Sequence, residues 1–324
     1  MVSPSLVHRP GDHRARPRSA GAPTPSPVPP KDAAPRTAHS YRSSRRNPAW
    51  ASRTAVKALL AIGALYSVFP LIWLVTSAAK SPNNLLGTSM FHIDGTAIAD
   101  NIRRVLDQDD GIYLTWFGNS FLYAGAGAVG STVICVAAGY AFDKYRFPFR
   151  EKLFGVVLVG VLVPVSALAL PMYLLASKAG LNNSYWAVFV PSLLNPFGVY
   201  LARIFARSYI PDEVIEAGRI DGASDLRLFR SIGLPMMVPG FVTIFLFQFV
   251  TIWNNFFLPL VMLSDRALFP VSLGLYTWSG NTTQAPEFYP LVITGSLLAV
   301  LPLIIVFIAL QRYWRSGLTM GSVK

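Results

Sequence analysis

The stretch from residue 288 to residue 311 reads FYPLVITGSLLAVLPLIIVFIALQ and contains no charged side chain. About 20 apolar residues in a helix are enough to cross the roughly 30 Å hydrocarbon core of a bilayer. The stretch therefore predicts a transmembrane helix and an all-α fold. Over the 324 residues of the chain, 52% are hydrophobic and 14% are charged, a balance that is typical of a polytopic membrane protein.

Five more stretches of the same kind precede it along the chain. They are residues 54–79, 116–142, 153–177, 185–202 and 236–263. Within all six, Lys57 is the one charged residue, and it lies near an end from which its amine can reach the membrane interface. We therefore expect six transmembrane helices, with ends defined to within about two to four residues.

The lysines and arginines predict which loops face the cytoplasm, because basic loops are retained there far more often than they are translocated. Of the 28 basic residues, 23 lie in the two terminal segments, in the loop around 144–152 and in the segment 203–230, and five lie in the intervening loops. We expect a multi-pass protein of the bacterial cytoplasmic membrane with both termini in the cytoplasm. The net charge of +12 then reflects contact with anionic membrane lipid, and it gives no reason to expect nucleic-acid binding.

Composition divides the chain into four parts. Residues 1–53 are rich in proline, arginine and serine and predict a disordered, basic cytoplasmic tail. Residues 54–115 hold the first transmembrane helix and an external loop rich in aspartate, which is either a solvated connector or a contact for a soluble partner. Residues 116–312 form the core transmembrane domain, and residues 313–324 form a cytoplasmic C-terminal tail.

The loop between the fourth and fifth predicted spans, residues 208–235, contains the sequence PDEVIEAGRIDGASDLRLFRSIGLP from Pro211 onward. Proline suits the first position of a helix, and the acidic residues that follow favour its positive dipole end. Gly222 suits a turn, residues 223–231 suit a second short helix, and Pro235 suits the return to the membrane. The sequence therefore predicts a helix, a turn and a helix in the cytoplasm.

Seven residues of this loop carry a recognisable pattern. They are Glu216, Ala217, Gly218, Gly222, Ile232, Leu234 and Pro235. Their spacing resembles the signature loop of binding-protein-dependent permeases of ATP-binding-cassette (ABC) importers, with Gly218 in place of the second alanine of a Glu-Ala-Ala triplet. Glycine weakens a helix by about 1 kcal/mol relative to alanine, but it is equally able to permit a close contact.

The resemblance implies a type I ABC importer permease fold, in which this loop is a coupling helix that docks in a groove of a cytoplasmic ATPase. It implies a low-profile contact at Ala217 and Gly218 and an ion pair from Glu216 to a basic group of the ATPase. The alternative is an ordinary amphipathic connector with an acidic first turn.

Two more stretches are similar to the carbohydrate branch of this family, and in particular to the smaller membrane subunit of maltose-type importers. They are WNNFFLPL at 253–260 and QRYWRSGLTMGSVK at 311–324. This resemblance implies transport of a sugar or related solute without a cofactor. The implied partners are a second permease in a heterodimer, two cytoplasmic ABC ATPase subunits and an extracytoplasmic solute-binding protein.

Four side chains of the fifth predicted span are candidates for the substrate path: Gln248, Trp253, Asn254 and Asn255. The amides can donate and accept hydrogen bonds, and an indole offers a face for the apolar side of a sugar ring. The same side chains are equally suited to join helices to one another, because polar side chains often hydrogen-bond between transmembrane helices. Both interpretations are consistent with the sequence.

Two other classes of protein fit less well. An ion-coupled secondary transporter usually carries ionisable groups inside the membrane, and none of the six stretches contains an acidic residue. An enzyme is not expected, because the four histidines lie outside these stretches, and we predict no catalytic residue and no metal site. The chain has no Gly-x-x-x-x-Gly-Lys-Ser/Thr phosphate loop, so ATP hydrolysis is expected on a partner ATPase.

Overall fold

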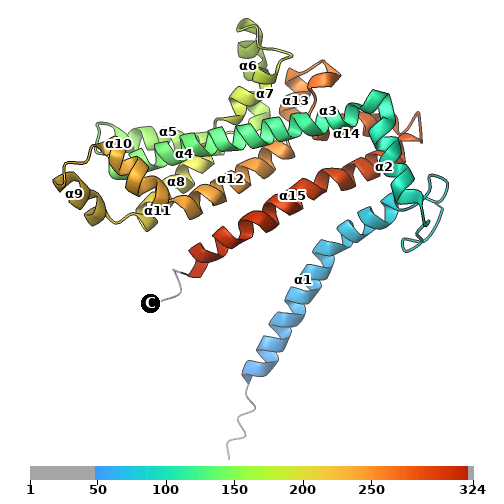
Figure 1. Cartoon of the computed structure of the whole chain (residues 1–324), viewed down its shortest axis with the longest axis horizontal. Coiled ribbons are helices and arrows are strands. Elements are labelled where there is room, and N and C mark those ends of the chain that lie inside the picture. Colours follow the sequence, from blue (N-terminus) through green and yellow to red (C-terminus); the bar gives the residue numbers. More distant parts are fainter. Residues whose placement is uncertain (1–47, 86, 320–324) are drawn as a thin grey trace, which may run out of the picture. The chain divides into compact units, whose positions relative to one another are not determined.

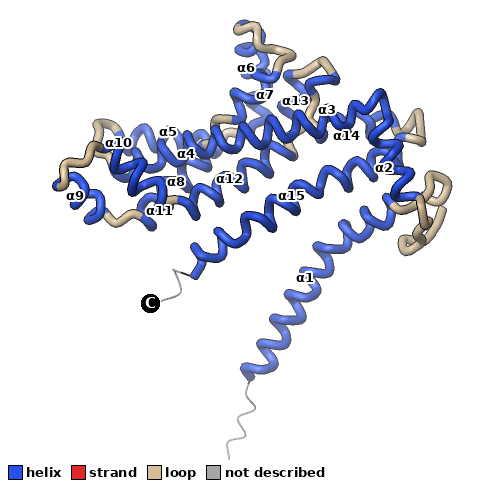
Figure 2. The backbone as a smooth tube through the Cα atoms, viewed as in Figure 1, coloured by secondary structure: helices blue, strands red, loops and turns tan. Residues whose placement is uncertain are grey.

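The computed structural model describes residues 48–85 and 87–319, and side chains from 53 to 313. Helices make up nearly all of this part of the chain, and it contains no β-strand (Figure 2). The longer elements of the first half are α1 (Pro48–Ala78), α2 (Ala97–Asp107), α3 (Ile112–Phe121), α4 (Gly127–Lys144), α5 (Arg150–Leu162), α6 (Val165–Lys178), α7 (Tyr185–Ser192) and α8 (Pro196–Tyr209). Those of the second half are α9 (Asp212–Ile220), α10 (Asp225–Leu228), α11 (Leu234–Met236), α12 (Val238–Trp253), α13 (Phe257–Met262), α14 (Val271–Asn281) and α15 (Phe288–Thr319).

The chain divides into two units, Met1–Ala58 and Leu59–Lys324, and the contacts below lie in the second. The predicted tail 1–53 falls outside the described residues except for its last six, where α1 has already begun. At the other end, α15 continues to Thr319, so the segment predicted as a C-terminal tail from residue 313 is helical over its first half. Residues 320–324 lie outside the described part of the chain.

Within the described residues, four helices are long and apolar enough to cross a membrane, and the number rises to six if each of two bent pairs counts as one span. The first bent pair is α5 and α6, which meet at 104° around Pro164 where we expected one helix over 153–177. The second pair joins Asp225–Met236 to α12 at 74°. Proline removes a backbone donor and clashes with the preceding turn, which explains why the first break lies there.

The fifth predicted span, 236–263, is also interrupted. α12 ends at Trp253, residues 254–256 are not helical, and α13 begins at Phe257. By contrast, the second predicted span lies inside a longer helical run, Ala97–Lys144, that includes a π-helical turn at Leu122–Ala126. The chain is therefore a helical membrane protein whose spans are partly broken.

Close contact between α4 and α8 forms the centre of the fold, and α12 packs on the same side of α4 (Figure 1). Gly139 permits the approach, because a Cβ there would lie 2.6 Å from the backbone nitrogen of Arg203 and would also strike Ala202. Small residues let transmembrane helices pack by van der Waals contact where lipid gives no hydrophobic drive. Around this contact, Cys135, Val136 and Tyr140 are buried.

A second core lies at the other end of the same helices. Trp116 is fully buried and donates its indole hydrogen to the carbonyl oxygen of Arg266 at 2.8 Å. Its ring lies 4.9 Å from that of Trp278, and Gly274 leaves room for it. The hydroxyl of Tyr113 donates to the carbonyl oxygen of Gly295 at 2.7 Å, which ties α3 to α15.

The loop predicted to be external and acidic contains α2 and a compact turn. Asp94 accepts hydrogen bonds from the backbone nitrogen of Ser81 at 2.6 Å, from Asn84 at 3.1 Å and from His92 at 2.9 Å. These bonds, led by the one from Ser81, hold the pKa of Asp94 well below its ordinary value. The Asp94 carboxylate therefore stabilises the fold of the loop itself.

Candidate functional site

The 208–235 loop begins where α8 ends. Pro211 is the N-cap of α9, and Asp212 and Glu213 occupy its first turn. Proline cannot extend the preceding helix because its nitrogen carries no hydrogen, and the two carboxylates favour the positive end of α9. The predicted helix is present, with Asp212 as its first residue instead of Pro211.

Gly222 makes the turn that ends α9. Its φ is +76°, a left-handed conformation that glycine adopts without steric cost. The backbone nitrogen of Ala223 donates to the carbonyl oxygen of Gly218 at 3.0 Å, and that of Gly222 donates to Arg219 at 3.0 Å. This pair of bonds is a Schellman motif, which satisfies the last carbonyl groups of a helix. The predicted role of Gly222 as a turn residue is confirmed.

The second half of the loop differs from the single helix predicted over 223–231. α10 covers only Asp225–Leu228, a π-helical turn follows over Phe229–Gly233, and α11 covers Leu234–Met236. Pro235 lies in the first turn of α11, where a missing N–H is tolerated, so it does not end a helix there.

The inner face of the loop is a small apolar core. Ile215 is 3% exposed and Leu228 is 1% exposed. Gly218 lies against Leu228, since a Cβ at this position would strike the Cδ2 of that leucine. The glycine that replaces alanine in the signature pattern therefore lies on the side of α9 that packs inside the loop.

The outer face of the loop carries the remaining signature residues of α9. Glu216 and Ala217 are exposed, and Ile220 is 86% exposed at the end of the helix. Leu226, in α10, is also exposed. An exposed carboxylate beside large exposed apolar side chains is a surface that a protein partner can bury.

Gly233 is a further residue of the loop that sequence reasoning did not select. A Cβ at this position would lie 2.6 Å from the ring of Tyr140 in α4. Ile232 is partly buried beside it, whereas Leu234 and Pro235 are exposed. The need for glycine comes from an aromatic ring far earlier in the chain, and no local pattern reports such a contact.

Lys144, the last residue of α4, lies at the base of the loop. Its side chain is 3% exposed, and its amine donates to the carbonyl oxygen of Ile210 and to Oδ1 of Asp212, both at 2.6 Å. It also lies 3.1 Å from Oδ2 of Asp143, which in turn pairs with Arg207 at 3.2 Å. The hydrogen bond from Lys144 lowers the pKa of Asp212 below its ordinary value.

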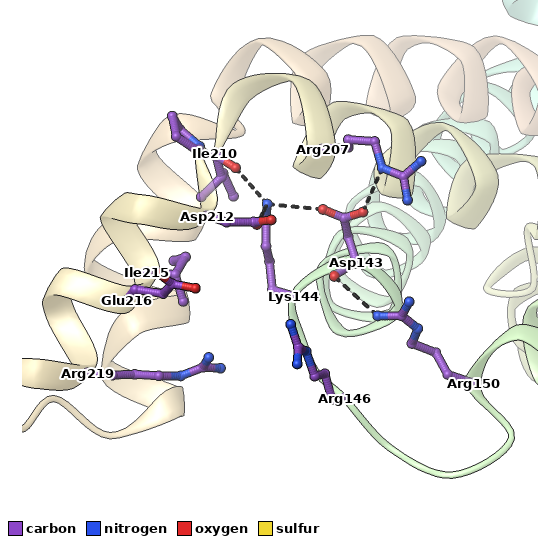
Figure 3. A pocket seen from close by; sticks show the side chains of 11 residues that line it. Asp143, Lys144, Arg146, Arg150, Arg207, Ile210, Asp212, Ile215, Glu216 and Arg219 are labelled. Atoms are coloured by element: carbon purple, nitrogen blue, oxygen red, sulfur yellow. Dashed lines mark hydrogen bonds and ion pairs between the residues drawn. The ribbon is translucent and has the colours of Figure 1, made fainter. Parts of the chain in front are cut away.

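A cavity of about 330 Å³ opens between this base and α9 (Figure 3). Five basic and three acidic side chains line it. They are Lys144, Arg146, Arg150, Arg207 and Arg219, with Asp143, Asp212 and Glu216. Asp143 and Asp212 pair with Lys144 and Arg207, and two carboxylates outside the cavity, Glu151 and Asp225, pair with Arg150 and Arg219. Most of the basic side chains therefore already have a carboxylate partner.

Tyr145, which follows Lys144, contacts α10 of the 208–235 loop. Its hydroxyl donates to the carbonyl oxygen of Asp225 at 3.2 Å. Burial, together with the nearby Asp225 carboxylate, raises the pKa of Tyr145, so this hydroxyl keeps its hydrogen at neutral pH. Arg219 reaches the same Asp225 at 3.3 Å and links α9 to α10.

Gln248, a candidate for the substrate path, is 7% exposed at the junction of α12 with the break between α7 and α8. Its amide nitrogen donates to the carbonyl oxygen of Ser192 at 2.9 Å. Its amide oxygen accepts from Asn195 at 2.8 Å, and the oxygen of Asn195 accepts from the backbone nitrogen of Gly198 at 2.8 Å. These are the bonds expected of a side chain that joins helices.

The other three path candidates lie around the end of α12. Trp253 is 2% exposed, and its indole donates to the carbonyl oxygen of Ala299 at 3.1 Å. Asn254 is exposed and donates to Val250 of its own helix at 2.8 Å. Asn255 is half-buried and accepts from the backbone nitrogen of Leu258 at 3.2 Å. Of the four, Asn254 is the one whose side chain is open to a solute in this chain.

No three histidine, cysteine, aspartate or glutamate side chains within residues 48–85 and 87–319 gather closely enough to hold a metal ion. The charged groups at the base of the loop are instead paired with one another and with backbone carbonyl oxygens. Such an arrangement can position helices, and it has no group placed to perform bond chemistry.

Comparison with known proteins places this geometry in a family. The model of the family described as "Binding-protein-dependent transport system inner membrane component" matches residues 130–319, a range that contains all but the first three residues of α4, the 208–235 loop and α12. More than half of the chain is covered.

Individual relatives agree. The arabinooligosaccharides transport system permease protein AraQ of Halalkalibacterium halodurans is 34% identical over 272 residues, which cover 82% of this chain and 96% of that protein. The lactose transport system permease protein LacG of Rhizobium radiobacter is 31% identical, covering 82% and 94%. A chain in the crystal structure of a bacterial ABC transporter involved in the import of the acidic polysaccharide alginate has the same fold, with a TM-score of 0.70, 24% identity and coverage of 84% and 98%.

Proposed function

The chain belongs to the family of binding-protein-dependent transport system inner membrane components, the permeases of ABC importers, and from this membership we propose its role in detail. It pairs with a second, unlike permease, and the two enclose the path of a sugar or related solute across the cytoplasmic membrane. Two ABC ATPases bind beneath the pair, and a solute-binding protein delivers the solute from outside. The chain itself is a transport subunit without enzymatic activity.

The proposed topology has six spans, with each bent pair counted as one span and both termini in the cytoplasm. The basic residues support it, because the loop around 144–152 and the segment 203–230 hold nine of the 14 lysines and arginines that lie between the predicted spans. With this orientation the cavity at the base of α9 faces the cytoplasm, and the loop that contains Asp94 faces outward.

One observation carries the coupling role: the outer face of α9. Glu216, Ala217 and Ile220 are exposed on a short helix that is held against the ends of α4 and α8 (Figure 1). We assign this face to the groove of an ATPase subunit, with Glu216 pairing with a basic residue there. The remaining signature residues then have a structural task, because Gly222 ends the helix and Gly218 packs on Leu228.

The transported solute is proposed to be a sugar or a short oligosaccharide. The names of the relatives support this class, because both AraQ and LacG are permeases of saccharide transport systems. Within this chain, Asn254 is the proposed direct contact, since it is exposed at the break between α12 and α13, and the half-buried Asn255 lies beside it. Gln248 and Trp253 would act on the path indirectly by fixing the position of α12.

In the proposed cycle, the ATPases close on ATP and move α9. The loop passes this movement to the spans that it joins, and the path changes from inward-facing to outward-facing. Energy enters through differential binding of the ATPases to the two states, which is the general requirement for a coupled conformational change. No residue of this chain forms or breaks a covalent bond.

Purification of the tagged full-length chain from its native membrane in mild detergent tests the proposal. We expect an ABC ATPase and a second permease to be recovered with it, together with vanadate-sensitive ATPase activity. The binding protein of the same system would then be screened against mono- and oligosaccharides by thermal shift, because a ligand that binds only the native state raises the melting temperature. A chain recovered alone, with uptake driven by an ion gradient and independent of ATP, would overturn the proposal.

A further inference from the structure

The link between α8 and α9 is short and not helical. α8 ends at Tyr209 and α9 begins at Asp212, so Ile210 and Pro211 are the whole connection. Ile210 is extended, with ψ of 100°, and Pro211 is extended, with ψ of 141°. Two extended residues form a joint that can bend, because no helical hydrogen bond passes through Pro211.

Lys144 bridges this joint from a different helix. Its amine bonds to the carbonyl oxygen of Ile210 on the α8 side and to Asp212 on the α9 side, both at 2.6 Å. Its third neighbour is Asp143 at 3.1 Å. An ammonium group has three donors, so all of them have an oxygen partner here. The cation also suits its position at the C-terminal end of α4, where the helix dipole is negative.

The cation lies inside the protein, whereas its partner on α9 lies at the surface. The Lys144 side chain is 3% exposed and that of Asp143 is 6% exposed, but 79% of the Asp212 side chain is exposed. Without the amine, Asp143 would still pair with Arg207 at 3.2 Å, so no buried carboxylate would be left without a cation. Figure 3 shows the amine of Lys144 directed between Ile210, Asp212 and Asp143.

The start of α10, in the middle of the loop, is bonded to the same part of the chain. Tyr145, next to Lys144, donates to the carbonyl oxygen of Asp225 at 3.2 Å, and Arg219 pairs with the Asp225 side chain at 3.3 Å. α9 and α10 are therefore joined to each other and, at two points, to the end of α4. The covalent neighbours of the loop are α8 and α12, whereas the side-chain contacts lead to α4.

We propose that Lys144 is a positioning residue that locks the joint at Ile210 and Pro211, so that α4 and the α9–α10 pair move as one body during transport. The inference rests on the proposed function and adds to it the helix that receives the movement. Among the described helices, α4 makes its most extensive contact with α8, so displacement of α4 moves both helices together. The Lys144 cluster is defined here as Asp143, Lys144, Ile210 and Asp212.

The first test measures coupling in proteoliposomes that contain the complete importer. In Lys144→Gln, we expect the solute molecules imported per ATP hydrolysed to fall by about fivefold or more, the size of a typical allosteric coupling. The yield of assembled complex and the basal ATPase rate should change by less than about twofold, because the outer face of α9 is intact. Lys144→Arg should restore coupling, since a guanidinium also donates to several oxygens.

The matched control is Lys152→Gln, which removes a lysine from the start of α5. Lys152 has its amine over the ring of Phe149 at 5.4 Å and takes no part in the Lys144 cluster, so coupling should be unchanged. Asp212→Asn should resemble Lys144→Gln, and the double variant should be no worse than either one, because both remove the same bridge. Additive losses would contradict the bridge.

A distance measurement tests the rigid-body claim directly. Spin labels at Arg146→Cys and Ile220→Cys, in a complex with Cys135→Ala, report the separation of the α4–α5 loop from the end of α9. We expect the same mean distance in the nucleotide-free and the vanadate-trapped complex, and a second, state-dependent distance once Lys144→Gln is added. A distance that already changes between the two states with Lys144 present would overturn the proposal.

The two possible failures are distinguishable. Absence of an ATPase from the wild-type complex overturns the proposed function. A wild-type importer that transports normally, with an unchanged coupling ratio in Lys144→Gln, overturns the role of Lys144 alone. A parallel loss of yield, basal ATPase and transport that Lys144→Arg does not restore would assign Lys144 to folding and would also overturn it.

Discussion

Two regions of the chain differ in whether their side chains remain exposed to a partner after folding. At the helix junction, formed by Gly139, Asn195 and Gln248 with their neighbours on α4, α8 and α12, the buried amides are bonded to other helices. In the 208–235 loop, the polar contacts lie at the base, around Lys144, and the face with Glu216 and Ile220 stays open.

The first region therefore fixes the arrangement of the helices, whereas the second can transmit the movement of a partner to them. A buried junction whose amides bond across helices fixes those helices in one arrangement, and loss of such a bond is expected to reduce stability. A loop that is attached at its base and open on its outer face can receive a partner without a change in its own packing. Substitutions in the first region should therefore alter folding, and substitutions on the open face should alter only coupling.

The largest effect on stability is expected for Gly139→Ala. The added methyl group would meet Ala202 and lie 2.6 Å from the backbone of Arg203, which cannot move aside as a side-chain end can. We expect a loss of about 3 kcal/mol in the free energy of unfolding, at the upper end of the usual range for overpacking. Reversible unfolding in sodium dodecyl sulfate measures it. Gly155→Ala is the control, because nothing lies within 4 Å of that position, and equal stability of the two variants would contradict the close contact.

A smaller loss is expected for Gln248→Leu. The substitution leaves the carbonyl oxygen of Ser192 and the amide nitrogen of Asn195 without these partners in an apolar environment. A loss of about 1 to 2 kcal/mol in the same unfolding assay follows from the range for such bonds. Asn254→Leu should leave stability unchanged, because Asn254 bonds only to its own helix. If Asn254→Leu also leaves the affinity for solute unchanged, Asn254 is not part of the path.

Gly218→Ala tests whether a residue of the loop acts on stability or on coupling, and it should change the free energy of unfolding less than Gln248→Leu does. Alanine strengthens α9 by about 1 kcal/mol, and the contact with the flexible end of Leu228 offsets part of this gain. We expect a net change below about 1 kcal/mol and normal transport. Loss of coupling at unchanged stability would show that Gly218 contacts the ATPase, as the family pattern implies, and that its packing on Leu228 is secondary.

The smallest effect is expected from pH. The pKa of Asp212 is held below its ordinary value by Lys144, so the carboxylate is charged above that pKa and the bridge is lost only as the pH falls through it. The coupling ratio should therefore be constant from pH 8 down to about pH 5, because an unperturbed aspartate titrates near 3.9. A decline of the ratio over this interval that is absent from Asp212→Asn would contradict the assignment.

Features that depend on neighbouring residues in the sequence were predictable. The apolar stretches predicted the helices, Pro211 with the acidic residues after it predicted α9, and Gly222 predicted the turn, because dipole interactions and left-handed turns are local effects. The spacing of the signature residues predicted the family, which the match over residues 130–319 then established.

Features that depend on tertiary contacts were not predictable. Pro164 was visible, yet a proline in a membrane span can be tolerated, as Pro171 is inside α6, or can break the helix, and the 104° bend between α5 and α6 does not follow from the local sequence. The partners of Lys144 are Ile210 and Asp212, and the partner of Gln248 is Asn195, all far away along the chain. Local patterns do not report such pairs.

The most direct test of the account is the Glu216→Lys importer in proteoliposomes, with uptake and ATP hydrolysis measured in the same preparation. Glu216 is exposed on α9, where it also lines the cavity at the base of the loop, so the charge reversal should change the unfolding free energy and the assembly of the permease pair by little. We predict that solute uptake is lost while residual ATP hydrolysis continues, because the ATPases no longer move this chain. Normal uptake driven by ATP in this variant would remove the 208–235 loop from the mechanism.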